Sequence, residues 1–442
     1  MNHNFQRKRR NEKSKGVRFA VPFFLLPLAL CLCAGPARGQ NGVTCDSVGA
    51  TSRGRGGTNL AHSDNGAIVL DNPAGMANLD SSGLLEFGVE GLITDVHYSD
   101  PLNSTTNKIR PEALPEISYI RKSPGGDWAF GLGLFAPAGF GAEYHINNQV
   151  FGRQQYESFG ALGKILPAIS YKLTDQLSIG GSFGVGLSTV QLEGPFHLQT
   201  GAVAGVPVLL HTHGTEAAPV WSVGMQYQLC DRTTVGAAYT EESRFNLGGK
   251  LDASVAGLGP APVYSRFDSQ INIVWPRSVG VGFTHLLTER QRLSTDVYWF
   301  DWSSAFNNVG LRLTNASNPL FPALLGPTIR DQFPLHWHDT VSVRLGYEFL
   351  LTPCDVLRAG YVYDSPAVPS ATLSPYIPGI LQHTFSLGYG RQWENWRFNI
   401  AYQYNFSPTQ HVSQSALVGG DFNNSDIRAQ VHWLFMSVSR RF

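Results

Sequence analysis

The sequence has little of what marks a helical membrane protein or a metal-stabilised domain. After residue 39 it contains no run of about 18 apolar residues, so no transmembrane helix is expected. Charged residues make up only 15% of the chain and aromatic residues 12%, which argues against a disordered protein. The cysteines beyond residue 39 are Cys45, Cys230 and Cys354, and they are too dispersed for a zinc motif.

Catalytic motifs are missing as well. Several Ser and His residues are present, but no nucleophile motif links them. We therefore expect no enzyme activity, no cofactor and no bound metal. A disulfide between Cys230 and Cys354 is permitted in an oxidising compartment, but the short turns that carry them are not neighbours in the sequence, so a bond is not expected.

Residues 1–39 have the composition of a secretory signal peptide. A basic segment precedes an apolar one, residues 21–33, which is too short to span a bilayer, and small residues near positions 37–39 offer a cleavage site. The alternative is an uncleaved membrane anchor. These residues hold eight of the 33 basic and one of the 33 acidic residues, so the remaining chain is net acidic and shows no basic patch for nucleic acid.

The rest of the chain alternates between apolar and polar residues. The clearest run has apolar side chains at Trp396, Phe398, Ile400, Tyr402, Tyr404 and Phe406, with mainly polar residues between them. A strict period of two is typical of a β-strand with one apolar face. Many runs reach about 9–16 residues, the length that a tilted membrane strand requires.

Fourteen such strands can be assigned, and the connections between them alternate in length. Short turns on one side and long segments on the other are expected of an outer-membrane barrel, with the short turns in the periplasm. The strands are expected near residues 83–97, 114–122, 127–136, 160–173, 177–192, 216–229, 233–245, 269–286, 292–304, 338–350, 356–364, 379–391, 395–406 and 426–442. The long segments, expected to be external loops, include residues 137–159, 193–215, 246–268 and 305–337.

The last strand carries a second sign of an outer-membrane protein. Counting back from the terminal residue, Phe442 shares one face with Val438, Met436 and Leu434. A terminal aromatic on an alternating strand resembles the sorting signal of outer-membrane proteins, although Arg440 departs from it. We expect a monomeric barrel in the outer membrane, inserted by the barrel-assembly machinery and surrounded by outer-membrane lipid.

Residues 40–82 precede the barrel strands and have no strand pattern. They are rich in Gly, Ala, Asn and Asp. A segment of this kind is expected either to fold inside the barrel lumen or to form a flexible periplasmic tail.

Five motifs in order resemble the FadL-like transporters of long-chain fatty acids and hydrocarbons. The resemblance covers essentially all of the mature chain. The motifs are the Gly-rich stretch at 53–57 with Asn72, Pro73, Ala74 and Gly75; the third-strand region at 131–139 with Glu143, Tyr144, Gly152 and Arg153; Trp275 to Gly280; Trp337 to Thr340; and Asp364 to Pro369.

The resemblance implies an all-β protein: a 14-stranded antiparallel transmembrane barrel with a small N-terminal hatch in its lumen. The domains would be a signal peptide (1–39), a hatch (40–82) and a barrel (83–442). Hydrophobic ligand, such as a long-chain fatty acid, would be captured at extracellular loops and released sideways through a kink in the third strand. We place the kink at Gly133, Pro137 and Gly139, because Pro removes a ladder hydrogen bond; the alternative is a simple turn into the next loop.

Two of the long connections are unusually apolar for external loops. One contains Val208, Leu209 and Leu210, and the other contains Leu320, Phe321, Leu324 and Leu325. Exposed apolar segments mark binding sites in many proteins, and buried methylene groups bind an acyl chain at roughly 0.8 kcal/mol each. These residues are expected either to form the first capture groove or to pack on each other as a loop core.

Two other functions fit a barrel. A general diffusion porin would lack the hatch and prefer polar solutes, and an outer-membrane lipid hydrolase would carry a Ser/His pair on a barrel face. Sugar-driven liposome swelling tests the first, and an ester hydrolysis assay tests the second.

Overall fold

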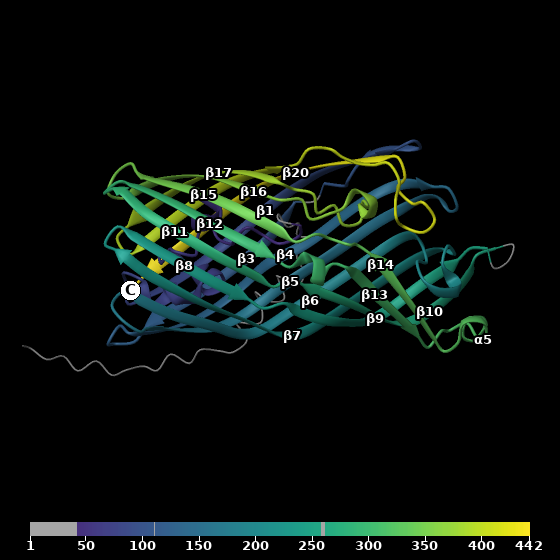
Figure 1. Ribbon diagram of the computed structural model, residues 1–442, viewed down its shortest axis with the longest axis horizontal. Coiled ribbons are helices and arrows are strands. Elements are labelled where there is room, and N and C mark those ends of the chain that lie inside the picture. The colour runs from purple at the N-terminus through teal and green to yellow at the C-terminus, as the bar shows by residue number, and fades with distance from the viewer. Residues whose placement is uncertain (1–41, 110, 258–260) are drawn as a thin grey trace, which may run out of the picture.

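The computed structural model describes residues 42–109, 111–257 and 261–442, which form one long barrel (Figure 1). The predicted signal peptide at 1–39 lies outside the described residues. The fourteen-stranded antiparallel barrel is confirmed. The strands of the closed ring are β1 (Gly83–Asp100), β3 (Glu112–Lys122), β4 (Trp128–Asn148), β5 (Gly152–Lys172), β6 (Leu177–His197), β7 (Pro207–Cys230), β8 (Thr233–Thr240), β11 (Ser278–Thr288), β12 (Gln291–Phe300), β15 (Thr340–Leu350), β16 (Asp355–Asp364), β17 (His383–Trp393), β18 (Trp396–Phe406) and β20 (Ser425–Arg441).

The ring closes between its first and last strands. β1 and β20 are paired from the Leu84–Arg441 rung to the Ser99–Asp426 rung. This pairing leaves neither the first nor the last strand with an open edge in the hydrocarbon, where unpaired backbone groups would be costly. The strands are joined at one end by short turns, which identifies that end as periplasmic. Cys230 and Cys354 are exposed free cysteines at this end.

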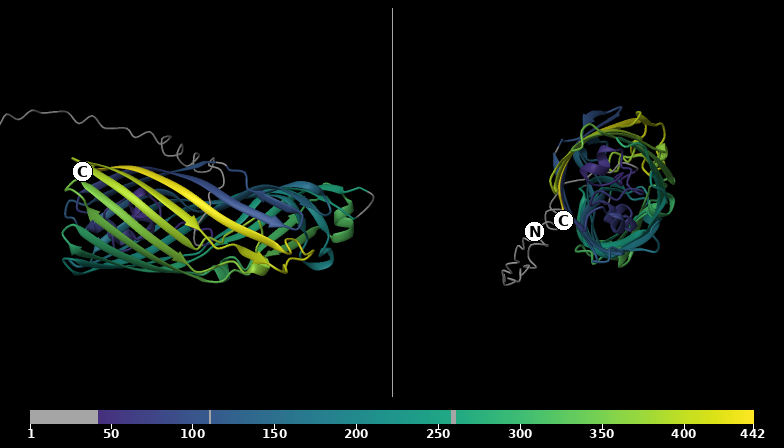
Figure 2. Two further views of the ribbon diagram at one scale, coloured as in Figure 1. Left: turned by 90° about the horizontal axis from the view of Figure 1, so that it is seen from above. Right: turned by 90° about the vertical axis from the view of Figure 1, so that its left-hand side faces the viewer.

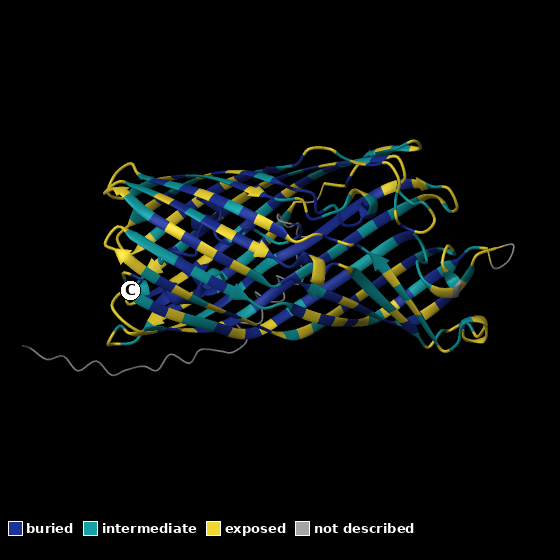
Figure 3. Cartoon of the chain, in the orientation of Figure 1, coloured by how far each residue is buried: buried dark blue, intermediate teal, exposed yellow. Residues whose placement is uncertain are grey.

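Buried and exposed residues alternate along the strands (Figure 3), and many of the exposed ones on the ring strands are large and apolar. On β18, Phe398 and Ile400 are 49% and 43% exposed, whereas Gln403 and Asn405 are fully buried in the lumen. The same holds at the C-terminus, where Leu434, Met436 and Phe442 are exposed and Val438 is half-buried. The ring of Phe442 stacks on that of Tyr119, with the centroids 5.9 Å apart. Its role as a sorting signal stays a prediction.

The expectation of long external loops was wrong, because most of these residues continue as strands. β4, β5, β6 and β7 extend beyond the apolar belt, and four further strands form a polar-faced wall above the ring, here called the sleeve. The sleeve consists of β9 (Ser243–Val255), β10 (Val263–Trp275), β13 (Asn308–Thr314) and β14 (Thr328–Pro334). The sequence did not predict the sleeve, because a membrane strand is expected to have an apolar outward face. In the sleeve the outward faces are polar and the inward faces are apolar.

Short breaks separate the sleeve from the ring. The predicted strand at 233–245 is interrupted at residues 241–242, between β8 and β9, and that at 269–286 at Pro276 and Arg277, between β10 and β11. The smaller elements are β2 (Asn103–Thr106), β19 (Gln410–Val412), α4 (Trp302–Ala305), α5 (Leu320–Leu325), η2 (Gly201–Val203) and η3 (Ser370–Thr372). No helix in the described part of the chain is long and apolar enough to cross a membrane.

Residues 42–82, here called the hatch, fill the lumen near the periplasmic end (Figure 2). The hatch contains α2 (Ala50–Gly54), α3 (Ile68–Asp71) and η1 (Pro73–Asn78), and most of its residues are buried. It is packed closely against the wall: a Cβ atom added to Gly180 of β6 would lie 2.5 Å from the backbone nitrogen of Ala74. The hatch therefore lies inside the barrel rather than outside it as a tail.

Candidate functional site

The barrel wall is incomplete between its second and third strands. β3 pairs with β4 only as far as the Ile117–Leu134 rung. Above this rung β3 continues beside β1 to Glu112, and β4 continues beside β5 to Asn148. The two strands therefore diverge, and one edge of β4 is left without β3 as a neighbour.

The predicted kink residues lie at the start of this divergence. Gly133 is still paired with both neighbouring strands, Pro137 lies in a bulge where the β4–β5 register shifts between Phe135 and Ala138, and Gly139 resumes pairing with β5. The strand does not turn into a loop at Pro137. A bulge adds a residue to one strand and bends it, so the sequence signal and the divergence coincide.

The start of the hatch occupies the edge that β3 has left. Residues 43–45, here called the strap, run antiparallel to β4: the Cys45 nitrogen donates to the Pro137 oxygen at 2.8 Å, and the Gly139 nitrogen donates to the Val43 oxygen at 2.9 Å. Burial raises the pKa of the Cys45 thiol to about 11, so the strap brings no charged thiol to this position. Two backbone hydrogen bonds hold the strap on the bulge.

Beside the strap lies a cavity of about 100 Å³, here called the inner pocket. Strap residues, the bulge at Pro137, and Leu162 and Lys164 of β5 line it, together with Trp275 and other residues of the opposite wall. The Lys164 side chain is only 8% exposed, and it has no hydrogen-bond or ion-pair partner among residues 42–109, 111–257 and 261–442. An ammonium group without a partner in such a surrounding is costly, so Lys164 is a candidate residue for binding an anion.

Two apolar cavities lie above the inner pocket. The middle pocket, about 80 Å³, is lined by Phe140, Phe196, Tyr376 and aliphatic side chains. The groove, about 160 Å³, lies between the sleeve and α5. Leu210 lines both the groove and the middle pocket. Phe140 of the middle pocket and Trp275 of the inner pocket have ring centroids 6.5 Å apart, so the three cavities follow one another down the lumen.

Most of the predicted capture residues come together in the groove. Val208 and Leu210 from β7 face Phe321, Leu324 and Leu325 from α5. The first two are strand residues, not loop residues. Leu209 and Leu320 do not line the groove: Leu209 lies between two inward-facing residues of β7, and Leu320 is 39% exposed on α5.

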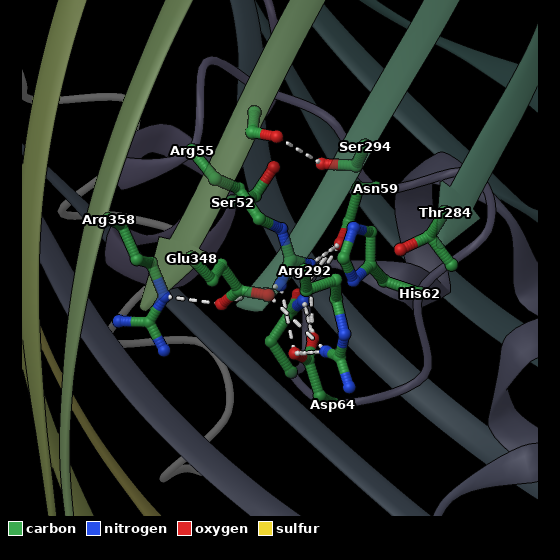
Figure 4. Close-up of polar contacts among 12 residues, drawn as sticks. Ser52, Arg55, Asn59, His62, Asp64, Thr284, Arg292, Ser294, Glu348 and Arg358 are labelled. Atoms are coloured by element: carbon green, nitrogen blue, oxygen red, sulfur yellow. Dashed lines mark hydrogen bonds and ion pairs between the residues drawn. The ribbon is translucent and has the colours of Figure 1, made fainter. Parts of the chain in front are cut away.

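Below the pockets, the hatch is joined to the wall by buried ion pairs (Figure 4). Arg55 of the hatch contacts Asp64 at 2.8 Å and Glu348 of β15 at 3.5 Å. Glu348 also pairs with Arg358 at 2.9 Å and Arg292 at 3.3 Å. Opposing the effect of burial, Arg55 holds the pKa of Asp64 well below its usual range. Charged groups in this network therefore have partners on both the hatch and the wall.

His62, Asp64 and Glu348 lie close enough to hold a metal ion. However, the carboxylates already accept from the guanidinium groups of Arg55, Arg292 and Arg358. Burial, followed by the charge of Arg55, lowers the pKa of His62 to about 3. Three cations beside the cluster oppose a fourth, so we interpret it as a hatch-to-wall network.

The predicted hatch motif fixes the end of the hatch. The Asn72 side chain caps η1 by accepting from the Ala74 nitrogen at 3.2 Å, and it donates to the oxygens of Leu60 and Met225. Pro73 follows at the first helical position, where its missing N–H is tolerated. A Cβ atom on Gly75 would lie 2.8 Å from the His62 oxygen. The motif thus joins the end of the hatch to Leu60 in its middle and to Met225 of β7.

Two functional features escaped the sequence analysis. The strap has no alternation of its own, and its pairing with β4 joins residues almost one hundred positions apart. Lys164 did carry a signal: it occupies an inward register of β5 between the buried Leu162 and Leu166. A lone lysine on an inward apolar face is a sequence signal that indicates a candidate binding residue.

Comparison with known proteins agrees with the geometry. The family model described as outer membrane protein transport protein (OMPP1/FadL/TodX) matches residues 35–442. The P. putida toluene transporter TodX is similar with a TM-score of 0.76 and 21% identity, covering 90% of this chain and 99% of its own. A Pseudomonas aeruginosa FadL homologue gives 0.75 and 17%, covering 91% and 100%.

The Ralstonia pickettii toluene transporter TbuX gives a TM-score of 0.69 at 18% identity, covering 90% of this chain and 99% of its own. At these identities the similarity to solved structures establishes the fold alone. No curated protein is similar enough in sequence to match.

Proposed function

The chain belongs to the outer membrane protein transport protein family (OMPP1/FadL/TodX), and from that premise we propose that it carries acidic hydrophobic compounds, such as long-chain fatty acids, through the outer membrane. Members of this family transport hydrophobic compounds, and the barrel lies in the outer membrane. The structure supports the proposal with a chain of apolar cavities that a ligand can follow and with a lysine at the lower end of that chain.

The route begins at the groove and descends through the middle pocket to the inner pocket. Its upper part offers apolar side chains such as Val208, Leu210 and Phe321. An acyl chain of sixteen or so carbons would be stabilised there by roughly 0.8 kcal/mol for each methylene group that leaves water. A sugar or ion gains nothing from such walls, which argues against a general diffusion porin.

The single observation that supports an acidic substrate is the position of Lys164 in the inner pocket. Lys164 lines the inner pocket together with three other charged residues, Asp46, Asp71 and Arg344, but these have partners in the described structure and Lys164 has none. TodX and TbuX are described as toluene transporters; an uncharged hydrocarbon of that kind would leave Lys164 unpaired. A carboxylate at the end of an acyl chain would pair with it in a charge-assisted hydrogen bond.

Exit is proposed to be lateral, between β3 and β4. The hatch fills the lumen below the inner pocket and is held there by buried ion pairs. β3 and β4 diverge above the Ile117–Leu134 rung, and among the described residues the strap lies on the β4 edge at Pro137. This gap in the wall offers a path toward the bilayer. Breaking two strap hydrogen bonds is a far smaller change than breaking the hatch network.

Lys164→Met tests the substrate class. Affinity for a long-chain fatty acid is expected to fall about 10- to 100-fold, because a charge-assisted hydrogen bond is lost. Affinity for the methyl ester of the same acid should stay unchanged. Fluorescence or calorimetric titration of the purified barrel gives both values.

Lys108→Met is the matched control, since Lys108 is 58% exposed and pairs with Glu143 outside the inner pocket. If Lys164→Met weakened acid and ester equally, Lys164 would be structural and the acidic substrate class would be rejected.

Deleting Ala136 tests the lateral exit. The deletion removes the extra residue of the bulge, so that β4 regains regular register with β5 and loses its bend. Uptake into vesicles should be abolished while binding at the inner pocket persists. Full uptake by a correctly assembled deletion variant would rule out lateral release at this position.

A further inference from the structure

The hairpin that joins β13 to β14 ends in a tip with no charged residue. Between Arg312 and Arg330 the chain contains no Asp, Glu, Lys or Arg, and residues 315–327, here called the tip, include three prolines and three leucines. Leu320 is 39% exposed and Leu324 is 61% exposed. The tip, which includes α5, lies at the end of the molecule opposite the C-terminus (Figure 1).

The tip has one packed face and one bare face. Phe321 is 3% exposed, and its ring meets that of Phe267 in the sleeve at a centroid distance of 5.4 Å. Pro319, Pro322 and Ala323 are exposed with the two leucines; this bare face is apolar throughout. An apolar surface left in water on an exported protein marks a contact with something apolar.

Hydrogen bonds to β10 hold the tip in this orientation. The Ser317 nitrogen donates to the Arg266 oxygen at 2.8 Å, and the Asn315 side-chain nitrogen donates to Asp268 at 2.7 Å. The bare face is therefore presented by an ordered structure and does not collapse onto the sleeve.

Two arginines stand at the base of the tip. Arg312 of β13 and Arg330 of β14 are directly opposite each other in the sheet, and both are exposed. Neither guanidinium group has an ion-pair or hydrogen-bond partner in the described part of the chain. Like charges directly opposite each other destabilise a sheet, so an anion from outside the protein would stabilise this pair.

We propose that the tip docks on the surface of an aggregate of anionic amphiphiles, such as a micelle or vesicle of fatty acid. The bare leucines enter the apolar layer, and Arg312 and Arg330 contact the acidic headgroups. This combination of an apolar insertion and a basic collar is what binds a protein to an anionic lipid surface.

Continuity with the groove supports this occupant. Leu324 is largely exposed on the tip and also lines the groove, so the apolar surface runs from the bare face into the binding route. A ligand leaving the aggregate along Leu324 would reach Phe321 and Val208 without entering water. A protein partner is less suitable, because a stable interface buries about 800 Å² on each side, more than this small tip offers.

The proposal rests on the proposed function but is tested separately from it. The full chain in lipid nanodiscs is mixed with oleate vesicles and with phosphatidylcholine vesicles, and the captured fraction is measured by flotation. The double variants are Leu320→Asp with Ala323→Asp, two exposed positions of the bare face that do not line the groove, and Arg312→Gln with Arg330→Gln. Each should lower the affinity for oleate vesicles about tenfold or more, and salt should weaken capture by the wild type.

Matched controls are Val150→Asp, an exposed apolar residue at the β4–β5 turn, and Arg153→Gln beside it, and both should leave capture unchanged. Binding of monomeric fluorescent fatty acid, measured below its aggregation concentration, should be the same in all variants. Unchanged vesicle capture, equal capture of phosphatidylcholine vesicles, or a parallel loss of monomer binding would each overturn the docking proposal. Failure of the wild type to bind monomer would instead reject the proposed function.

Discussion

The lower and upper halves of the lumen are built on opposite principles. In the lower half, the hatch meets the wall through fully buried Arg53 and Arg55, whose charges are paired with Glu90, Asp64 and Glu348. In the upper half, apolar side chains surround the middle pocket and the groove. The inner pocket below them mixes apolar residues with charged ones, of which Lys164 is left without a partner in the described structure. An interface built of buried ion pairs holds one arrangement, whereas unfilled cavities with mainly apolar walls accept a guest.

The largest expected effect comes from breaking the ion-pair network of the lower half. Arg55→Met removes the fully buried cation that contacts both Asp64 and Glu348 and leaves them the partly exposed Arg292. Breaking a buried pair in this way costs about 3–5 kcal/mol. Amide hydrogen exchange within residues 50–78 should become faster by the corresponding factor, and liposomes should admit sugars. Arg277→Met is the control, because that pair with Asp301 lies at a partly exposed position, where Arg277 is 40% exposed. Equal exchange in the wild type and Arg55→Met would show that the network does not hold the hatch.

The next effect comes from polarising the apolar half. Leu210→Asp places a carboxylate where the groove meets the middle pocket, and ligand affinity should fall by about 2–4 kcal/mol. Leu209→Asp is the natural control, since the neighbouring side chain lies on the other side of β7 and does not line a pocket. Hatch exchange should be unaffected by either change. Similar losses in both variants would place the ligand somewhere other than these cavities.

A smaller effect concerns pH. Burial and Arg55 lower the pKa of His62 to about 3 in the folded protein, against about 6.5 when unfolded. Between these values only the unfolded chain binds the proton, so hatch stability falls as the pH falls through this window, by about 2 kcal/mol at pH 5. His62→Gln should remove this slope in hydrogen exchange, whereas exposed His145→Gln should not. A slope retained in His62→Gln would assign the pH dependence to other groups.

Much of the fold was predictable because one rule, a period of two, applies along every ring strand. The rule found β18 through Trp396 and its alternate neighbours, whereas the break in the third strand was placed from the family resemblance and from Pro137. It could not find the sleeve, where inward residues such as Leu251 are the apolar ones and the outward residues are polar. Alternation shows that a strand exists, but the medium outside the wall decides which face is apolar.

The candidate site was predicted only in part, for a different reason. The sequence singled out Val208, Leu210 and Phe321 as candidate capture residues because they are apolar in unexpected places, and the structure brings them together in one groove. The strap was not, because its position depends on an edge that β3 vacates far along the chain. When a segment binds to a strand edge that another strand has left, the sequence of that segment need not show any strand pattern.

The pairing of β1 with β20 also sets an order of assembly. The first and last strands share rungs from Leu84–Arg441 to Ser99–Asp426, so the ring cannot be sealed until the final residues of the chain have arrived. The hatch precedes β1 and is therefore exported before any strand of the wall. Its buried arginines must meet Glu348 of β15 and Gln403 of β18 while the ring is still an open sheet. The barrel wall therefore forms around the hatch, and the pairing of β20 with β1 closes the ring last.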